Sequence, residues 1–444
     1  MTLFGTSGIR GSAEDLFTNQ FCFDIGRTFS LFLKSHQEMG AVALGMDPRG
    51  SSPRIKEAII SGLIFEGRDV FDEGATPIPA INYILKVDSL FSGSIMVSGS
   101  HIKADLNGVK FFVFSEEILK ENEKEIEQIY EKNKNKIKYL SHNKNVTNEN
   151  RANEAYQDYL FELAQKPLPA WKVVVDAGDG AQSDTIPQVL KRLGLEVIEL
   201  NCSIQGVFYA RDTEIESDYS GLINKVKEVK ADFGVGYDAD GDRVVFIDEK
   251  GNFITGDYTG TLIAREVSGD TIVTPINASQ VIDKIGKKIV RTKVGSPYVV
   301  AKMKEKKAAF GFEANGGGIF TEMLSRDGGH STIEILNILS QSNKRLSELI
   351  SELPKYYIYR DKVDYKWELK DKIINEAKKT FKGDKIDETD GLKIWLNDNT
   401  WILFRSSLNA PEFRVFVESK SKEKAKNLIE EGLNFVKKLV NDKY

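Results

Sequence analysis

A strand–loop–helix–strand pattern that occurs three times constrains the fold of this chain more than any other feature. It begins at residues 41–71, where AVALGMD precedes a loop and the apolar-periodic run RIKEAIISGLIFEG, and it recurs at 171–200 and from residue 271 onward. Short β-branched runs that alternate with helical segments are typical of parallel strands joined by right-handed crossovers. The sequence therefore predicts three related α/β domains with mixed sheets.

The C-terminal part of the chain follows a different pattern. After about residue 354, DYKWELKDKIINEAKKTF predicts a helix, two strands follow with a turn at 397–399, and RVFVES and KEKAKNLIEEGLNFVKKLV predict a strand and a closing helix. Antiparallel strands beside helices indicate an α+β domain. Earlier in the chain, residues 116–150 predict an amphipathic helix and then a solvated boundary. We expect an α/β protein of four domains, at 1–145, 146–252, 253–354 and 355–444.

Composition excludes several classes of protein. The 444 residues carry a net charge of −5, whereas a dedicated nucleic-acid binder needs a large basic surface. The chain has no apolar run of roughly 18 to 20 residues, so we expect no membrane span. The start, MTLFGTSGIRG, does not resemble a signal peptide, so we expect the mature chain to begin here. Two cysteines, Cys22 and Cys202, cannot build a disulfide framework, which favours a cytoplasmic location.

The sharpest local motif is an acidic loop between two apolar runs, FGVGY and VVFID. Asp238, Asp240 and Asp242 occupy alternate positions, and Arg243 follows them. Like charges converging on one point need a cation, so the loop predicts a divalent metal site. A solvated hairpin turn is the plainer alternative. An EF-hand is a poorer one, because strands replace its helices and the glutamate at loop position 12 is missing.

A serine and a histidine stand together on a loop between two strand-like runs. Ser100 and His101 follow SIMV, and Lys110 lies in the next run, VKFFVF. A hydroxyl beside an imidazole and an ammonium suits a nucleophile or phosphate carrier with acid–base partners. Taken alone, the motif is also compatible with an ordinary loop.

Two further loops carry groups that suit a sugar phosphate. Glu313 and Asn315 lie in a glycine-rich loop that could bind vicinal hydroxyls, although a plain glycine-rich turn would look similar. Near the C-terminus, one segment gathers side-chain hydrogen-bond donors that suit a phosphate. These donors are Arg405, Ser407, Asn409 and Arg414. An ordinary surface loop is the plainer alternative.

In order and combination, these four motifs and the N-terminal GTSGIRG resemble the α-D-phosphohexomutase family, the phosphoglucomutases, phosphomannomutases and phosphoglucosamine mutases. The resemblance extends over essentially the whole chain. It implies four domains around a central cleft: a phosphoserine-bearing domain at 1–145, a metal-binding domain at 146–252, a sugar-binding domain at 253–354 and a phosphate-binding domain at 355–444. The partners that it implies are small hexose phosphates.

The resemblance also implies roles for single residues. Ser100 would carry the phosphoryl group and, with Asp238, Asp240 and Asp242, hold Mg²⁺. The other implied catalytic residues are His101, Lys110, Arg10 and Arg243. The implied substrate-binding residues are Lys293, Glu313, Asn315, Arg405, Ser407, Asn409 and Arg414. Either His101 or Lys110 would move the hydroxyl proton, and glucose 1,6-bisphosphate or an equivalent hexose bisphosphate would act as activator.

These roles predict a phosphohexomutase that interconverts hexose 1-phosphate and hexose 6-phosphate of glucose and/or mannose, with phosphoglucosamine mutase as the alternative. The rivals are a haloacid-dehalogenase-like phosphatase, suggested by DADGD after a strand, and a sensor that binds sugar phosphate without turnover.

The chain departs from the family pattern in three loops. Ile102 and Lys103 replace Asn-Pro, and Gly317 replaces a histidine of the sugar loop. In the phosphate loop, residues 408–410 read Leu-Asn-Ala where Gly or Asn, Thr and Glu are usual. These changes bear on substrate preference and phosphate affinity more than on reaction type.

Overall fold

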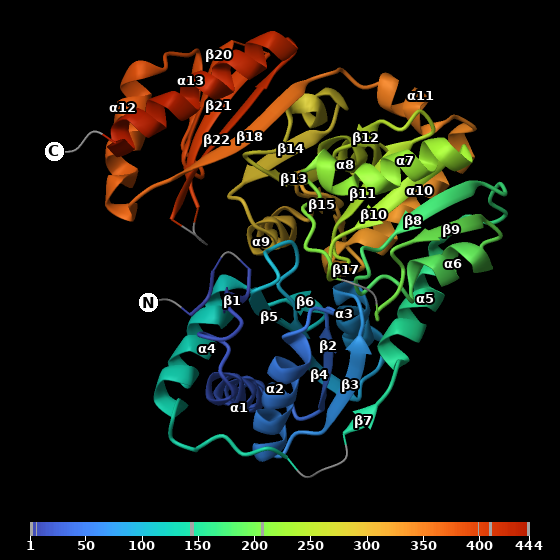
Figure 1. The fold of residues 1–444 in the computed structure, drawn as a ribbon, viewed down its shortest axis with the longest axis vertical. Coiled ribbons are helices and arrows are strands. Elements are labelled where there is room, and N and C mark those ends of the chain that lie inside the picture. Colours follow the sequence, from blue (N-terminus) through green and yellow to red (C-terminus); the bar gives the residue numbers. More distant parts are fainter. Residues whose placement is uncertain are drawn as a thin grey trace.

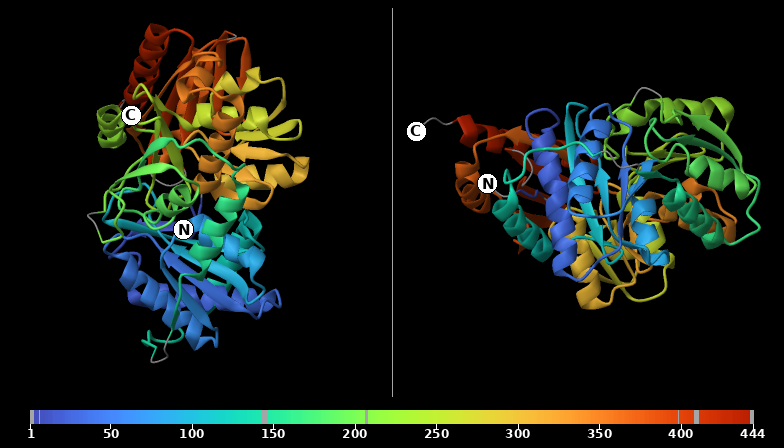
Figure 2. Two further views of the ribbon diagram at one scale, coloured as in Figure 1. Left: turned by 90° about the vertical axis from the view of Figure 1, so that its right-hand side faces the viewer. Right: turned by 90° about the horizontal axis from the view of Figure 1, so that it is seen from below.

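The computed structural model describes residues 3–5, 7–142, 146–205, 208–397, 399–407 and 411–441. In the described part, three sheets form, and helices cover them (Figure 1). The N-terminal domain, blue, and the C-terminal domain, red, lie at opposite ends of the molecule in Figure 1 and in the left view of Figure 2. The expected class, three α/β domains with mixed sheets and a C-terminal domain, is confirmed.

A twelve-stranded sheet joins the first and third domains. Its path is β14-β13-β15-β16-β17-β6-β5-β4-β2-β3-β7, and β1 pairs with β5. The join is a short parallel pairing of β6 with β17, in which Glu116 lies opposite Leu324. Sequence reasoning did not foresee it, because a two-residue strand has no periodicity to recognise. The strands are β1 (Ile9–Ser12), β2 (Ala41–Met46), β3 (Val70–Ala75), β4 (Phe91–Val97), β5 (Leu106–Val113), β6 (Glu116–Glu117), β7 (Thr147–Asn148), β13 (Thr271–Pro275), β14 (Lys288–Thr292), β15 (Phe310–Phe312), β16 (Gly318–Phe320) and β17 (Met323–Asp327).

Five helices surround the N-terminal part of this sheet: α1 (Asn19–Ser35), α2 (Ser52–Phe65), α3 (Ile78–Val87), α4 (Lys120–Asn133) and α5 (Arg151–Leu163). Thr18 caps α1 by accepting a hydrogen bond from the Phe21 N–H, and Pro53 lies in the first turn of α2, where it costs no backbone hydrogen bond. The predicted amphipathic helix is α4, which begins after β6. The helices α1, α2 and α4 share one core with the strands, and α3 packs on the opposite face beside α5.

The second domain has a five-stranded sheet in the order β12-β11-β10-β8-β9. Its elements are β8 (Lys172–Asp176), α6 (Ile186–Arg192), β9 (Glu196–Leu200), α7 (Ser220–Val229), β10 (Phe233–Tyr237), β11 (Val244–Asp248) and β12 (Phe253–Ile254). The strand β10 is buried along its whole length because helices pack on both sides of the sheet, as its continuous apolar run indicates. The antiparallel turn from β10 to β11 carries the acidic loop.

The third domain adds α8 (Gly256–Glu266), the 3₁₀ helix η2 (Gln280–Lys284), α9 (Ser296–Lys306), α10 (Gly328–Ser342) and α11 (Leu346–Ser351). Asp327 caps α10 by accepting from the His330 N–H at 2.7 Å. Both α8 and α10 also contact β11 of the second domain, so apolar packing fixes how these two domains sit together.

The fourth domain is a five-stranded antiparallel sheet in the order β18-β22-β21-β20-β19, with two helices on one face (Figure 1). Its elements are β18 (Tyr357–Asp364), α12 (Lys370–Thr380), β19 (Lys385–Asp387), β20 (Leu392–Asn397), β21 (Thr400–Ser406), β22 (Glu412–Ser419) and α13 (Lys422–Asn441). The sequence predicts all of the longer elements except β18, and the predicted helix begins later than expected, at Lys370.

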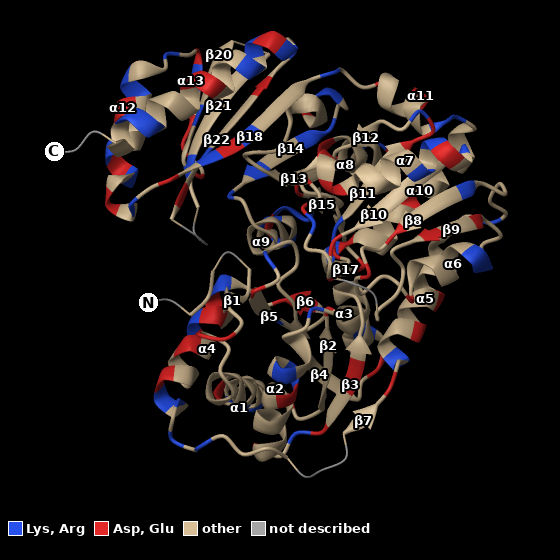
Figure 3. Cartoon of the chain, in the orientation of Figure 1, with Lys and Arg blue, Asp and Glu red and all other residues tan. Residues whose placement is uncertain are grey.

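In the described part of the chain, no helix combines the length and the apolar character that a membrane span requires. Figure 3 shows charges of both signs side by side on the outer helices α4, α12 and α13.

Candidate active site

A cavity of about 550 Å³ opens between the four domains. Its walls carry cationic side chains from each of them, and such a charge pattern suits an anionic ligand. The cations that line it are Arg10 of the first domain, Arg243 of the second, Arg326 of the third, and Arg360, Lys362, Arg405 and Arg414 of the fourth. Burial and the neighbouring charge of Arg243 lower the pKa of Arg10 to about 10, which reflects this positive potential.

Ser100 lies in the turn between β4 and β5, next to His101. Its hydroxyl is fully buried and donates a hydrogen bond to Asp238 Oδ2 at 2.7 Å. The Nδ1 atom of His101, which lines the cavity, lies 3.3 Å from the same hydroxyl. Ser100 and Asp238 are 138 residues apart in sequence, so only the docking of the first domain on the second brings them together.

The carboxylates of Asp238, Asp240 and Asp242 are all buried, and one ligand atom from each lies within 4.8 Å of the others. Burial and the two neighbouring carboxylates raise the pKa of Asp238 well above its usual range. One oxygen of Asp240 and one of Asp242 have no hydrogen-bond partner among the described residues. Buried carboxylate oxygens without partners are the hard ligands that Mg²⁺ takes, so the trio fits such an ion.

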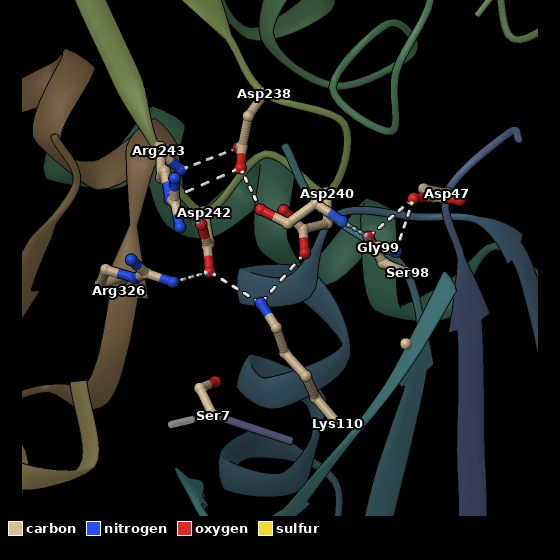
Figure 4. A network of polar contacts seen from close by, with 12 residues as sticks. Ser7, Asp47, Ser98, Gly99, Lys110, Asp238, Asp240, Asp242, Arg243 and Arg326 are labelled. Atoms are coloured by element: carbon tan, nitrogen blue, oxygen red, sulfur yellow. Dashed lines mark hydrogen bonds and ion pairs between the residues drawn. The ribbon is translucent and has the colours of Figure 1, made fainter. Parts of the chain in front are cut away.

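Cations surround the acidic trio, as Figure 4 shows. The Lys110 ammonium lies 3.0 Å from Asp240 and 3.1 Å from Asp242. Burial alone would lower the pKa of Lys110, but these two carboxylates raise it. Arg326 Nη2 lies 2.8 Å from Asp242, and the charges of Arg326 and Lys110 lower the pKa of Asp242 against the effect of its burial. Arg243 lies on the other side, 3.7 Å from both Asp238 and Asp242.

The imidazole of His101 is held neutral. Burial, followed by the cationic side chains of Arg243 and Arg10, keeps the pKa of His101 well below its usual range. A neutral ring can accept a proton from a hydroxyl, whereas the protonated ammonium of Lys110 can donate one.

The glycine-rich loop between β15 and β16 brings Glu313 and Asn315 to the cavity wall. Glu313 accepts a hydrogen bond from the Gly295 N–H at 3.0 Å and from Arg326 Nη1 at 3.2 Å. Gly317 has a φ of +76°, and a Cβ there would stand 2.1 Å from the carbonyl oxygen of Asp242. The metal-loop backbone therefore leaves no space for a histidine side chain at this position.

Arg405 projects from β21 toward the cavity. Side chains alternate along a strand, so Arg405 shares a face with Trp401 and Leu403, which pack against Ile276 of the third domain. Its Nε donates to Asp390 at 2.6 Å, and its Nη2 is buried without a partner among the described residues.

The other predicted substrate-binding residues lie in different places. Ser407 and Arg414 line the cavity. Lys293 is exposed, does not line the cavity in the described structure, and lies 6.0 Å from the Tyr298 ring centroid. Asn409, with its neighbours Leu408 and Ala410, lies outside the described residues.

Sequence reasoning missed Arg326 and Glu117. Arg326 joins the metal loop to Glu313, and the only local signal for it was its place directly before Asp327-Gly328. Glu117 accepts hydrogen bonds from the hydroxyls of Ser7 and Ser296, two residues that line the cavity. Neither role follows from a local pattern, since the partners come from distant parts of the chain.

Comparison with known proteins places the chain in a family. Three family models match it: phosphoglucomutase/phosphomannomutase α/β/α domain I at residues 1–137, domain II at 154–251 and domain III at 255–357. A phosphoglucomutase/phosphomannomutase of Thermococcus kodakarensis is 38% identical over 98% of each chain. A probable phosphoglucosamine mutase of Methanopyrus kandleri is 32% identical over 99% of this chain and 98% of its own.

A crystal structure of similar fold is that of a phosphoglucomutase/phosphomannomutase family protein from Burkholderia thailandensis. It matches with a TM-score of 0.83 and 25% identity over 100% of this chain and 98% of its own. With its four-domain fold and full-length relatives, the chain belongs to the phosphoglucomutase/phosphomannomutase family, the α-D-phosphohexomutases, which are isomerase-class phosphotransferases.

Proposed function

We propose that the protein interconverts the 1-phosphate and 6-phosphate of a hexose, glucose and/or mannose, through a phosphoserine at position 100 and a 1,6-bisphosphate intermediate. The observation that carries the proposal is the 2.7 Å contact of the Ser100 hydroxyl with Asp238. Their neighbours His101 and Arg243 line the cavity with cationic walls. Phosphoglucosamine mutase is the alternative, because a relative with that name matches 99% of the chain at 32% identity, against 38% over 98% for the phosphoglucomutase/phosphomannomutase. The two free thiols favour a reducing compartment, so we assign the protein to the cytoplasm.

The acidic trio and an oxygen of phosphorylated Ser100 would hold Mg²⁺. The unpartnered oxygens of Asp240 and Asp242 support this ligand set. When bound, the ion neutralises charge that develops on the transferring phosphoryl group. Arg243 and Lys110, which both lie beside Asp242, add positive charge of the protein itself next to the metal ligands.

In the first transfer, a free sugar hydroxyl attacks the phosphorus of phosphoserine 100. A bond forms between phosphorus and the sugar oxygen, and the hydroxyl proton passes to a protein base. The bond from phosphorus to Ser100 Oγ breaks, and this oxygen takes up a proton as it leaves. His101, whose neutral ring lies 3.3 Å from the Ser100 hydroxyl, is ready to accept the proton of the sugar hydroxyl. Lys110, 3.0 Å from Asp240, is the alternative base, and it would first have to release a proton of its own. The product of this step is a hexose 1,6-bisphosphate.

The bisphosphate then turns around in the cavity and returns its other phosphoryl group to Ser100, which leaves the isomeric monophosphate. Two orientations of one sugar require contacts common to both. Glu313 and Asn315 suit the ring hydroxyls, and Arg405 suits the phosphate that does not react. Added glucose 1,6-bisphosphate would restore a serine that has lost its phosphate.

The Ser100→Ala variant tests this function. With glucose 1-phosphate, magnesium and a trace of glucose 1,6-bisphosphate, we expect a coupled assay to show nearly complete loss of turnover, while binding of glucose 1-phosphate persists. Ser94→Ala, at a buried serine one strand earlier, is the matched control and should retain turnover. Wild-type-like turnover of Ser100→Ala would remove the serine from its role.

Intact mass separates the mutase from an aspartate-dependent phosphatase. We expect a phosphoryl adduct that survives acid treatment, as a phosphoserine does, and that is absent from Ser100→Ala. Loss of the adduct in acid would indicate an aspartyl-phosphate instead. Turnover on the 1-phosphates of glucose, mannose and glucosamine, compared side by side, then decides between the proposed substrates and the alternative.

A further inference from the structure

The structure assigns a positioning role to Arg49: together with Asp47 it holds the loop from Ser98 to Leu106 so that the Ser100 hydroxyl stays at the acidic trio. The assignment rests on the proposed function, because it concerns the residue that would carry the phosphoryl group.

Arg49 lies between β2 and α2 and is 1% exposed. Its Nε donates to Asp47 Oδ2 at 2.9 Å. Its other donors all reach main-chain carbonyl oxygens of the serine loop: Nη2 that of Ser100 at 2.9 Å, and Nη1 those of Leu106 at 2.6 Å and Lys103 at 3.2 Å. One guanidinium therefore ties together the reactive residue, the middle of the loop and its end.

Asp47 holds the start of the same loop. Its Oδ2 accepts from the Ser98 hydroxyl at 2.7 Å and from the Gly99 N–H at 3.2 Å, as Figure 4 shows. The Ser98 hydroxyl in turn accepts from the Ser100 N–H at 2.8 Å. Gly99 has to lack a side chain here, because a Cβ would stand 2.1 Å from Arg49 Nη1.

The loop needs such support because its conformation is unfavourable by itself. Ser100 has a φ of +54°, in the left-handed region, which is unfavourable for a residue that carries a side chain. A backbone of this kind persists only where its surroundings determine it. Asp47 accepts a hydrogen bond from the N–H just before the strained residue, and Arg49 donates one to the carbonyl of that residue.

The middle of the loop lacks one restraint that the family pattern has. Lys103 stands where the family has proline, and a proline would restrict the loop by fixing its own φ. In this chain Arg49 donates a hydrogen bond to the Lys103 carbonyl. The Phe208 ring of the second domain stacks over the guanidinium, with its centroid 4.9 Å from Arg49 Cζ. The guanidinium is therefore shielded from solvent.

Arg49→Lys in the full-length enzyme tests the role. Lysine keeps the charge but has no planar fork to reach three carbonyls, so the conservative change should not rescue function. We expect kcat to fall about 10²-fold, the cost of a reacting group displaced by about 1 Å, while KM changes little. The rate at which glucose 1,6-bisphosphate phosphorylates Ser100, followed by intact mass, should fall in parallel.

Two variants keep the test specific. Arg68→Lys is the matched control: Arg68 is 4% exposed in the same domain and also donates to main-chain carbonyls, those of Ser30, Glu38 and Gly40, none of which belongs to the serine loop. It should lower the unfolding temperature and leave kcat unchanged. Lys103→Pro, added to Arg49→Lys, should recover part of kcat, and it removes no hydrogen bond made by the Lys103 N–H in the described structure.

Wild-type kcat in Arg49→Lys, equal losses of kcat in Arg49→Lys and Arg68→Lys, or no recovery with Lys103→Pro would each overturn the positioning role. If wild-type enzyme turns over none of the hexose phosphates, the proposed function fails. The positioning role is then tested by hydrogen exchange of the Ser100 and Ile102 amides, both of which are hydrogen-bonded in the loop. Their exchange rates should rise in Arg49→Lys and stay unchanged in Arg68→Lys.

Discussion

At the scale of single residues, the acidic trio shows how a fold keeps three carboxylates together. Lys110 and Arg326 both lie against Asp242, so the charge of the trio is offset by side chains of the first and third domains. The same two cations would share Asp242 with a bound metal ion. Arg326 also contacts Glu313, which makes it the link between the metal loop and the sugar loop.

Replacement of Arg326 tests this link. Arg326→Met removes the positive charge that offsets the buried carboxylates of Asp242 and Glu313. Loss of one partner of a buried ion pair lowers the free energy of unfolding by about 3–5 kcal/mol. We expect a lower unfolding temperature without metal and a larger upward shift on adding Mg²⁺ than in wild type, because one competing cation is gone. Thermal unfolding with and without MgCl₂ measures both.

The control is Arg27→Met, which breaks a buried ion pair with Asp24 and Glu66 in the first domain, among residues that do not line the cavity. It should lose stability while its Mg²⁺ shift equals that of wild type. Equal Mg²⁺ shifts in Arg326→Met and wild type would contradict the competition.

At the scale of elements, strand periodicity accounts for much of what the sequence predicts. Alternation along β21 sends Ile402 and Phe404 to the helices of the fourth domain and Trp401 and Leu403 to the third domain. A continuous apolar run identifies β10 as a strand covered on both faces. In contrast, β18 was not predicted, because charges interrupt YIYRDKVD and only its pairing with β22 makes it a strand.

Strand β3 carries a titrating group that should make stability depend on pH. Burial, followed by the neighbouring charge of Glu149, raises the pKa of Glu73 to about 7, despite a hydrogen bond from the Ala152 N–H at 3.0 Å. Between about pH 5 and pH 7 the folded state keeps this proton while the unfolded state releases it, so the free energy of unfolding falls as pH rises through that window.

Glu73→Gln removes the titration. We expect equal stability of variant and wild type at pH 5, and a gain of more than about 1 kcal/mol for the variant at pH 8, because one pKa unit corresponds to about 1.36 kcal/mol. Urea unfolding at both pH values measures the difference. Glu154→Gln, at an exposed glutamate on α5, should show no such gain, and a flat difference for Glu73→Gln would refute the assignment.

At the scale of the whole molecule, contacts between domains complete the cavity. The pairing of β6 with β17 makes one sheet of the first and third domains, and apolar packing of α8 and α10 joins the third to the second. The fourth domain is held partly by Arg360 of β18, whose Nε lies 3.2 Å from Glu214 and whose Nη2 lies 2.7 Å from Asp257. One side chain thus connects three domains beside the cavity.

Loss of that connection should loosen the fourth domain without unfolding it. For Arg360→Met we expect faster hydrogen exchange along β18 and a severalfold rise in KM for the hexose phosphate, because the cavity wall is less pre-organised. Lys378→Met, which breaks an exposed pair with Glu388 inside the same domain, should change neither. Unaltered exchange along β18 in Arg360→Met would exclude the role.

The sequence by itself determined the local order of elements, since periodicity and turn residues act over a few positions, and it supplied the motifs from Ser100 to Arg405 that mark the candidate site. It did not indicate Arg326, Glu117 or Arg49, whose partners lie far away in the chain. Only the tertiary structure decided which loops meet, because docking depends on the apolar surfaces that the domains bury against one another.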